Sequence, residues 1–243
     1  MMVLVVGASG ATGRKLVDQL IMLGQQVKVV VRASSQLPAH WNESNQIHII
    51  TSNILDFSEV ELRGLVQDCS AIASCLGHNM TWKGIYGDPK KLVTDATRRL
   101  CKAVEMNAPK EAVKFVLMNT TGNRNRDLNE PISFAEKAAL GFFRLLLPPH
   151  TDNEAAADYL RSEIGQNNTS ISWVAVRPDS LLHEEEVSDY SLFPSPIRSA
   201  LFKPGKTSRI NVAHFMATLV YDNSLWLKWK GQMPVIYNRA SLD

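Results

Sequence analysis

A glycine-rich stretch near the start of the chain constrains the fold more than any other feature. Residues 2–6 are a short apolar, branched run that predicts a buried strand, and the sequence GASGATG follows at once at residues 7–13. From Arg14 to Leu23, apolar side chains recur at helical spacing. A strand, a glycine turn and a helix in this order predict a dinucleotide-binding loop at the start of an α/β fold.

Each glycine of this loop has an expected physical role. Gly7 lets the chain leave the strand sharply, Gly10 lets the backbone approach a pyrophosphate, and Gly13 lets the helix pack closely against the sheet. The free amides and the positive end of the helix then face the phosphates. The loop residues expected to contact the cofactor are Gly7, Ser9, Gly10, Ala11, Thr12 and Gly13. An ordinary strand-to-helix turn is the competing interpretation, but strand, spacing and helix all agree.

The bulk properties indicate a globular chain of one domain. Its 243 residues, 45% hydrophobic and 21% charged, fit one domain over 1–243, with residues 179–210 as a small cap-like elaboration. A net charge of +2 does not argue for a nucleic-acid partner. We expect no membrane span and no signal peptide, because the apolar runs are short and the chain begins with a strand.

The cysteines and the acidic stretches give no sign of a disulfide or a metal site. Cys69, Cys75 and Cys101 lie in apolar surroundings without metal-like spacing, which predicts buried free thiols in the cytoplasm. His183 stands beside three consecutive glutamates, but this order does not place ligands on one helix face. We read that stretch as a solvated acidic loop, and we expect no metal.

The end of the second predicted strand indicates which nicotinamide cofactor the chain binds. Arg32 follows the run 27–31, at the position where NAD-dependent domains carry an acid that holds the ribose 2′-hydroxyl. An arginine there can clamp a 2′-phosphate, and Ser34 and Ser35 can donate to the same group. The pattern therefore favours NADP(H), with a solvated surface arginine as the alternative.

Further site residues are expected where the later strands end. Ligands of such sheets bind outside the carboxyl ends of the strands. Cys75, Leu76 and Gly77 close the fourth predicted strand and should lie over the ribose and phosphates. His78 opens the loop that follows, which could line a substrate pocket.

Three parts of the sequence resemble atypical short-chain dehydrogenase/reductases, in their NmrA-like and biliverdin/flavin reductase-like branch. They are the Gly-x-x-Gly-x-x-Gly loop, the segment Val31–Pro38, and the stretch Tyr159–Glu163 with Arg177-Pro178 closing the next strand. The resemblance implies a doubly wound, mostly parallel Rossmann-like sheet that binds NAD(P). It also implies cofactor contacts, to adenine from Asn53 and Ile54 and elsewhere from Thr120, Arg177 and Pro178, while Thr120 or Thr121 would bind a substrate carbonyl. For Asn53 and Ile54, a plain loop is nearly as good an interpretation.

The chain departs from this family at its catalytic pair. The family's Tyr-x-x-x-Lys belongs at the start of the helix before the sixth strand, where this chain has residues 149–154, PHTDNE. A Tyr86–Lys90 match elsewhere is rejected, because Pro89 would break a helix between the two. His150 is the readily titrating side chain at the departing position and is our candidate proton donor, with His78 as its rival.

Two helices around this position were expected. Residues 134–147 read as a strongly apolar helix that forms core or a pocket wall and ends at Pro148-Pro149. A second helix over residues 152–164 is expected after a capping box formed by Thr151 and Glu154. The same spacing at Ser58 and Glu61 predicts an earlier helix over residues 57–67.

These features favour an NADPH-dependent reductase whose acceptor is planar and conjugated, such as a flavin or quinone. Such a reduction needs no Tyr–Lys pair, because the incipient anion is delocalised and water can protonate it. The alternative is a non-catalytic NADP-binding regulator of the NmrA-like type. A sugar-nucleotide epimerase or dehydratase is disfavoured, because it normally needs the missing tyrosine. The sequence leaves open the acceptor, the stereochemistry of transfer, and whether the chain is a monomer or a homodimer.

Overall fold

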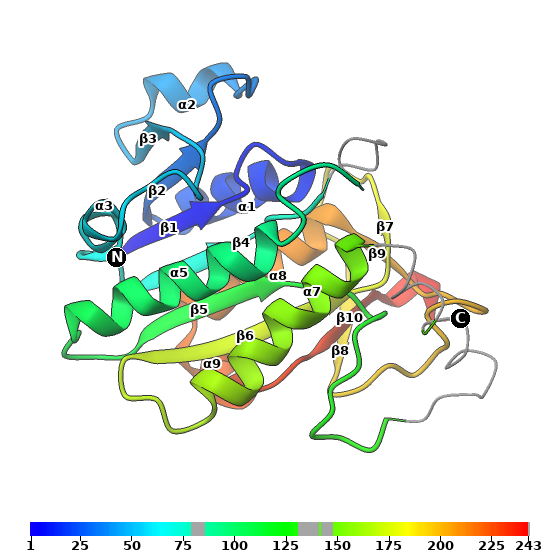
Figure 1. Cartoon of the computed structure of the whole chain (residues 1–243). Helices are drawn as coiled ribbons and strands as arrows, with labels where there is room; N and C mark the ends of the chain where they lie inside the picture. The colour runs from blue at the N-terminus through cyan, green and yellow to red at the C-terminus, as the bar shows by residue number, and fades with distance from the viewer. Residues whose placement is uncertain (79–85, 131–140, 142–147, 243) are drawn as a thin grey trace.

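A mostly parallel sheet forms the centre of the computed structural model, which describes residues 1–78, 86–130, 141 and 148–242 (Figure 1). Its eight strands lie in the order β3-β2-β1-β4-β5-β6-β10-β8, and only β8 runs antiparallel to its neighbour. In the same order they span Ile47–Thr51, Gln26–Val31, Met2–Val6, Ala71–Ser74, Val113–Met118, Ile171–Pro178, Val235–Asn238 and Tyr190–Phe193. The predicted doubly wound α/β class is confirmed.

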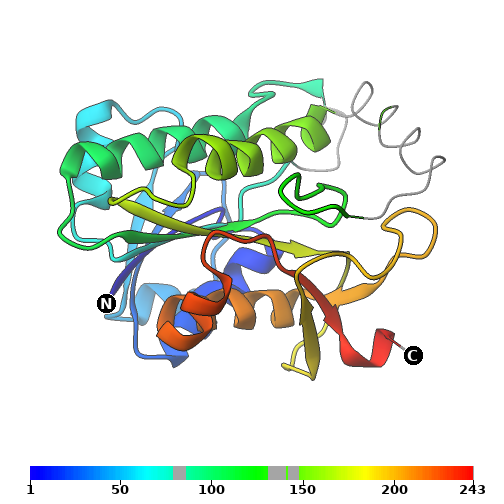
Figure 2. The ribbon, with the colours of Figure 1, turned by 90° about the horizontal axis from the view of Figure 1, so that it is seen from below.

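Helices cover both faces of this sheet (Figure 2). One face carries α3 (Glu59–Val66), α5 (Leu92–Asn107) and α7 (Pro148–Tyr159). The other carries α1 (Ala11–Met22), α2 (Ala39–Glu43), α8 (Arg209–Tyr221) and α9 (Asn223–Trp229). Each layer buries its own cluster of apolar side chains against the sheet, which is why the inner strands are apolar on both sides.

The strand order changes direction between β1 and β4. The chain first moves outward from β1 to β3 and then returns to place β4 on the other side of β1. Parallel strands that diverge in this way open a crevice at their carboxyl ends, where ligands bind. A small parallel sheet of β7 (Ser180–Leu182) and β9 (Lys206–Ser208) lies on the same side of the molecule, as Figure 1 shows.

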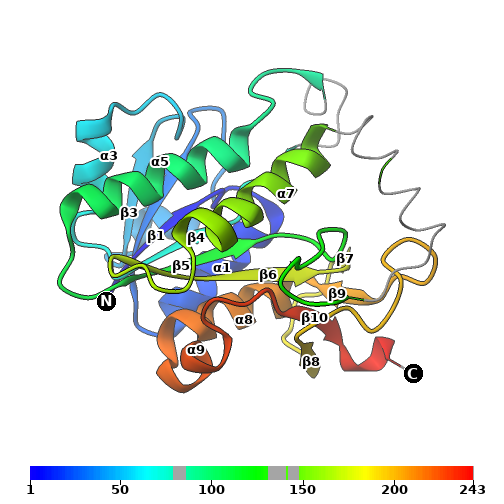
Figure 3. The ribbon, with the colours of Figure 1, turned by 60° about the horizontal axis from the view of Figure 1, so that its bottom comes forward.

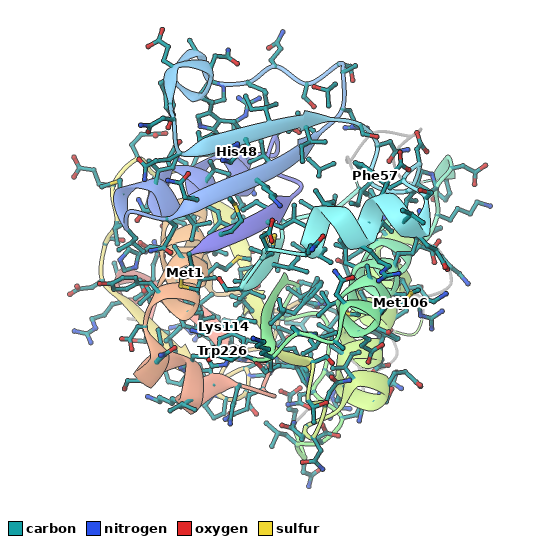
Figure 4. The ribbon with its side chains drawn as sticks, turned by 90° about the vertical axis from the view of Figure 1, so that its left-hand side faces the viewer. Met1, His48, Phe57, Met106, Lys114 and Trp226 are labelled. Atoms are coloured by element: carbon teal, nitrogen blue, oxygen red, sulfur yellow. The ribbon has the colours of Figure 1, made fainter. Side chains whose placement is uncertain are left out.

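A lysine at the opposite edge ties α8 and α9 to the sheet. Lys114 is the second residue of β5, and its Nζ donates to Val220 O and to Asn223 Oδ1, at 2.8 Å each. The same Nζ lies 5.3 Å from the ring centroid of Trp226. Figure 4 labels both residues in the side view. The positive charge of Lys114 interacts favourably with the negative end of the α8 dipole. This interaction helps to hold α8 in the orientation that places its beginning on the side of the cleft.

The helix boundaries confirm one predicted cap and correct another. Ser58 and Glu61 form the expected capping box at α3. The helix expected to begin near residue 152 instead begins at Pro148, so the predicted cap at Thr151 is wrong. Proline suits the first turn of a helix, because its missing amide would find no partner there. The same two prolines also suit the end of a preceding helix, which is why the sequence predicts a later beginning for α7. The apolar helix predicted over residues 134–147 lies outside the described residues, apart from Gly141.

Other boundaries differ in small ways. Strand β4 ends at Ser74, so Cys75, Leu76 and Gly77 follow the strand instead of closing it. After Tyr159 the last turns of the predicted helix continue as a π-helix, Leu160–Ile164. No helix in the described part of the chain has the length and apolar character that crossing a membrane requires.

Candidate functional site

A cleft of about 490 Å³ lies where β1, β2 and β4 end, at the point where the strand order reverses. This volume is in the usual range for a small-molecule site. Many of the predicted cofactor residues line it, namely Gly7, Ser9, Gly10, Arg32, Asn53, Ile54, Cys75, Leu76 and Gly77. His78 also lines the cleft, and so does Leu92, the first residue of α5.

The glycine loop has the backbone conformation that a phosphate cradle requires. Gly7 has φ +76°, and a Cβ there would lie 2.5 Å from the backbone of Cys75. A Cβ on Gly13 would lie 2.1 Å from Gly7 O, so Gly13 packs against the loop's own backbone and not mainly against the sheet. A Cβ on Gly10 would meet only Gly7 O, at 3.2 Å, because this glycine faces the cleft.

The beginning of α1 is left open for an anion. The first helical bond runs from Arg14 N to Gly10 O at 2.9 Å, and no side chain among the described residues caps the helix. The amides of its first turn therefore have no acceptor within the helix. Uncapped amides at the positive end of a helix suit a diphosphate, so these residues fit the dinucleotide predicted from the sequence.

Arg32 lies exposed at the end of β2 and lines the cleft. Among the described residues, no carboxylate forms an ion pair with its guanidinium. The loop that carries it is held by Arg14, whose side chain donates to Ser9 O at 3.0 Å and Gln36 O at 2.5 Å. Arg14 therefore fixes the glycine loop and the loop after β2 relative to each other. Ser34 and Ser35 lie in this turn and do not line the cleft.

The loop after β3 supplies one polar and one apolar wall. Asn53 donates to Asp56 Oδ1 at 3.0 Å, and Ile54 is buried. Both reach the cleft, as the resemblance implied. Ser52, which the sequence did not single out, lines it beside them.

A buried carboxylate joins the cleft to α7. Asp152 Oδ2 lies 2.8 Å from His78 Nε2, and the two side chains are only 1% and 5% exposed. Asp152 also accepts from Val93 N at 2.8 Å and Thr94 N at 2.9 Å, at the beginning of α5. Burial alone would raise the pKa of Asp152, but the hydrogen bonds from His78, Thr94 and Val93 outweigh it and hold the pKa below its usual value.

His150 lies on the same turn of α7 but faces the end of β5. A Cβ built on Gly122 would lie 3.4 Å from the His150 ring and 3.7 Å from Thr120 Oγ1, which places these groups together. Thr121 is buried near the Asp179 carboxylate, where it offsets part of the rise in the pKa of Asp179 that burial causes. Of the two threonines, Thr120 therefore has its hydroxyl on the side of Gly122 where the His150 ring lies, whereas Thr121 lies near a protein carboxylate.

Arg177 and Pro178 do not line the cleft. The Arg177 guanidinium is fully buried and forms a bidentate ion pair with Glu130, with N–O distances of 2.7 and 3.2 Å. It also donates to the carbonyl oxygens of Met233, Asn123 and Pro194. The Arg-Pro pair that carried the resemblance thus has a structural role here, joining β6 to the loops around it, and we leave it out of the proposed site.

The pairing of His78 with Asp152 had no signal in the sequence. Asp152 is 74 residues from His78, and both belong to segments whose relative position depends on the sheet order.

The acidic stretch after His183 contacts other parts of the protein: Glu184 contacts Asn238, and Glu185 pairs with Lys15 at 2.8 Å. Within the described ranges, no three His, Cys, Asp or Glu side chains are placed to share a metal ion.

A doubly wound sheet with an uncapped glycine loop at its switch point defines a Rossmann-type dinucleotide-binding protein. The chain matches the family model described as NAD(P)H-binding over residues 7–223. It therefore belongs to the NAD(P)H-binding family, and the predicted resemblance to atypical short-chain dehydrogenase/reductases is confirmed. No curated protein sequence matches the chain.

Solved structures share this fold across nearly the whole chain. A Bacillus halodurans protein named as an NAD-dependent epimerase/dehydratase is 21% identical, with a TM-score of 0.70, covering 98% of this chain and 94% of that one. A short-chain dehydrogenase/reductase from Veillonella parvula in complex with NADP is 15% identical, with a TM-score of 0.69, covering 99% and 95%. ChuY, an anaerobilin reductase from Escherichia coli O157:H7, is 16% identical, with a TM-score of 0.67, covering 98% of both chains.

Proposed function

We propose that the protein is an NADPH-dependent reductase that transfers a hydride to a planar, conjugated acceptor of the flavin, quinone or tetrapyrrole type. The observation that carries the proposal is the composition of α7 beside the cleft. Its first turns hold His150, Asp152 and Asn153, where short-chain dehydrogenases of the ordinary kind hold a tyrosine and a lysine. ChuY, which has a similar fold, is named for such an acceptor.

The absence of a Tyr–Lys pair at this position selects among reactions. Reducing an isolated ketone produces a localised alkoxide, which needs a proton donor in the transition state. A flavin, quinone or conjugated tetrapyrrole spreads the developing charge over many atoms, so a weak donor or water suffices. Epimerases and dehydratases of this fold normally use the tyrosine, which disfavours that reaction despite the name of the Bacillus halodurans protein.

The choice of NADPH rests on the end of β2. Arg32 lines the cleft there without a carboxylate partner in the described residues, and no acid occupies the position that would hold a ribose 2′-hydroxyl. An unpaired guanidinium gains a charge-assisted hydrogen bond from a 2′-phosphate and gains less from a hydroxyl. The complex of the Veillonella parvula protein with NADP agrees with this choice.

The residues of the chain act mainly by position. The glycine loop and α1 hold the diphosphate, Arg32 holds the 2′-phosphate, and Asn53 and Ile54 frame the adenine. When bound, NADPH supplies a hydride from its nicotinamide ring. His78 after β4, Thr120 after β5 and His150 on α7 are the polar groups that orient the acceptor or hydrogen-bond it. Most of the rate would then come from proximity and orientation.

The second candidate function is a non-catalytic NADP-binding regulator. The missing Tyr–Lys pair fits this function equally well, because a regulator needs no catalytic residues. The same experiment separates the two. Calorimetric titration measures NADPH affinity, and absorbance at the nicotinamide band measures NADPH oxidation with a panel of flavins, quinones and linear tetrapyrroles. Binding with turnover supports the reductase, binding without turnover with any acceptor supports the regulator, and failure to bind overturns both.

A further inference from the structure

An arginine from the far end of the chain reaches the glycine loop. Arg209 is the first residue of α8, and its Nη1 lies 3.5 Å from Thr12 Oγ1, 197 residues away. Thr12 belongs to the first turn of α1 and is buried. Helices α1 and α8 pack along each other on one face of the sheet, as Figure 3 shows, so both begin at the edge where the cleft opens.

The guanidinium of Arg209 lacks the partners that a half-buried arginine usually has. A guanidinium carries five N–H donors. The contacts of Arg209 are Thr12 Oγ1 and His183 Nε2, each at 3.5 Å, which is the outer limit of a hydrogen bond. By contrast, Arg177 makes five contacts of 2.7 to 3.2 Å to carbonyl and carboxylate oxygens. In the described part of the chain, no carboxylate forms an ion pair with Arg209.

The position of this charge is electrostatically unfavourable in the protein alone. The beginning of a helix carries a partial positive charge, so a cation in the first turn of α8 is disfavoured. The beginning of α1 is the second positive end beside it, and it has no capping side chain. Lys15, one turn further along α1, has its charge matched by Glu185 at 2.8 Å, whereas no carboxylate among the described residues pairs with Arg209. An anion bound between the two helix ends would attract Arg209 and both helix ends, and so offset their mutual repulsion.

We infer that Arg209 binds the diphosphate of the dinucleotide, closing the phosphate site from the side of α8. The inference rests on the proposed cofactor site and adds to it a ligand from outside the glycine loop. The glycine loop provides neutral amide donors, and Arg32, at the end of β2, is assigned to the 2′-phosphate. Arg209 supplies the full positive charge for the diphosphate. It also joins α8 to the cofactor, so that binding stabilises the contact between the two ends of the chain.

Fragments of the cofactor separate the roles of the two arginines. NADPH, NADH and ADP-ribose all contain the diphosphate, whereas adenosine 2′-monophosphate contains the adenine and the 2′-phosphate assigned to Arg32 but no diphosphate. We would titrate each ligand into the wild type, R209Q, R209K and K206Q, using direct calorimetry for the tight ligands and displacement of NADPH for the weak one. Lys206 is an exposed cation three residues earlier, so K206Q removes the same charge without touching the site.

The expected pattern is specific. R209Q should weaken NADPH, NADH and ADP-ribose by a common factor of roughly 10- to 100-fold, the range for a hydrogen bond to a charged group, and leave adenosine 2′-monophosphate unchanged. R209K keeps the charge without the planar fork and should lose less. K206Q should bind like the wild type.

Two results would overturn the inference. One is R209Q binding all ligands within about twofold of the wild type, and the other is a loss confined to NADPH and adenosine 2′-monophosphate, which would assign Arg209 to the 2′-phosphate. Circular dichroism of each variant checks the fold, and if R209Q is unfolded the same comparison is made with R209K, for which wild-type affinity for ADP-ribose overturns the inference. If the wild type itself binds no NADPH, the proposed function fails instead.

Discussion

His78 and Asp152 form a buried pair, with Nε2 and Oδ2 2.8 Å apart, that links the wall of the cleft after β4 to the first turns of α7. The same carboxylate accepts two backbone amides at the beginning of α5 and so acts as a cap supplied by another helix. One side chain thus sets the relative positions of three segments around the proposed site.

This pair predicts how stability depends on pH. The pKa of Asp152 is lowered in the folded state, so its hydrogen bonds stabilise the protein above the ordinary carboxyl pKa of about 3.9, and that stabilisation is lost as the pH falls through the lower folded value. Asp152→Asn should reduce the free energy of unfolding by about 1.5–3 kcal/mol at pH 7, and the difference from wild type should shrink below about pH 4. Urea unfolding between pH 3 and 7 measures both.

Asp158 provides the matched control on the same helix. It pairs with Arg161 and Arg126 at the surface, where its side chain is 27% exposed, so Asp158→Asn should cost less than about 1 kcal/mol. Equal losses in the two variants would mean that Asp152 has no special structural role.

Gly10 and Gly13 should respond differently to the same substitution. A Cβ on Gly10 meets only Gly7 O, at 3.2 Å, so Gly10→Val should keep the fold and lose nucleotide binding through collision with the pyrophosphate. A Cβ on Gly13 would lie 2.1 Å from Gly7 O, so Gly13→Val should disturb the fold itself. Thermal unfolding and calorimetric titration with NADPH check the two outcomes. Wild-type affinity in Gly10→Val would refute the placement of the diphosphate.

Arg32 should decide between the two nicotinamide cofactors. Arg32→Ala should weaken NADPH by about 1.5–3 kcal/mol, the value of a hydrogen bond to a charged group, and leave NADH nearly unchanged. The affinities of both cofactors for the variant and for wild type provide the test. Parallel losses for NADPH and NADH would show that Arg32 does not read the 2′-phosphate.

The proton donor can be found from the dependence of the rate on pH. If His150 donates the proton, His150→Gln should lower the rate of NADPH oxidation by ~10²-fold or more and remove the dependence on pH between about 6 and 7, the ordinary range of an imidazole. The same measurements on His78→Gln distinguish the rival, whose ring is held by Asp152. A change of only a few fold in both variants would leave water as the donor.

The sequence predicted those parts of the fold that depend on residues close together in the chain. The apolar strands, the glycine loop and the capping box at Ser58 depend on neighbours within a few residues, and the structure confirms all three. The beginning of α7 was predicted wrongly, because Pro148-Pro149 suits both the end of one helix and the beginning of the next. Local chemistry does not distinguish the two.

The rest of the site depends on contacts between distant segments. The pairing of His78 with Asp152 and the approach of Arg209 to Thr12 arise only when the strand order brings three helix ends to one edge. Arg177 shows the opposite case, since its position at the end of a strand resembled that of a cofactor-binding residue. Its partner Glu130, which occupies the guanidinium, lies 47 residues earlier and gave no sequence signal.

Hydride transfer from NADPH is the central claim, and the most direct measurement is a kinetic isotope effect with NADPH carrying deuterium at either of the two positions on nicotinamide C4. The rate of oxidation would be followed with whichever flavin, quinone or tetrapyrrole reacts. The account predicts a slower reaction with deuterium at one of the two positions and an unchanged rate with deuterium at the other. NADPH oxidation no faster than in the absence of protein, across the whole panel of acceptors, would contradict it.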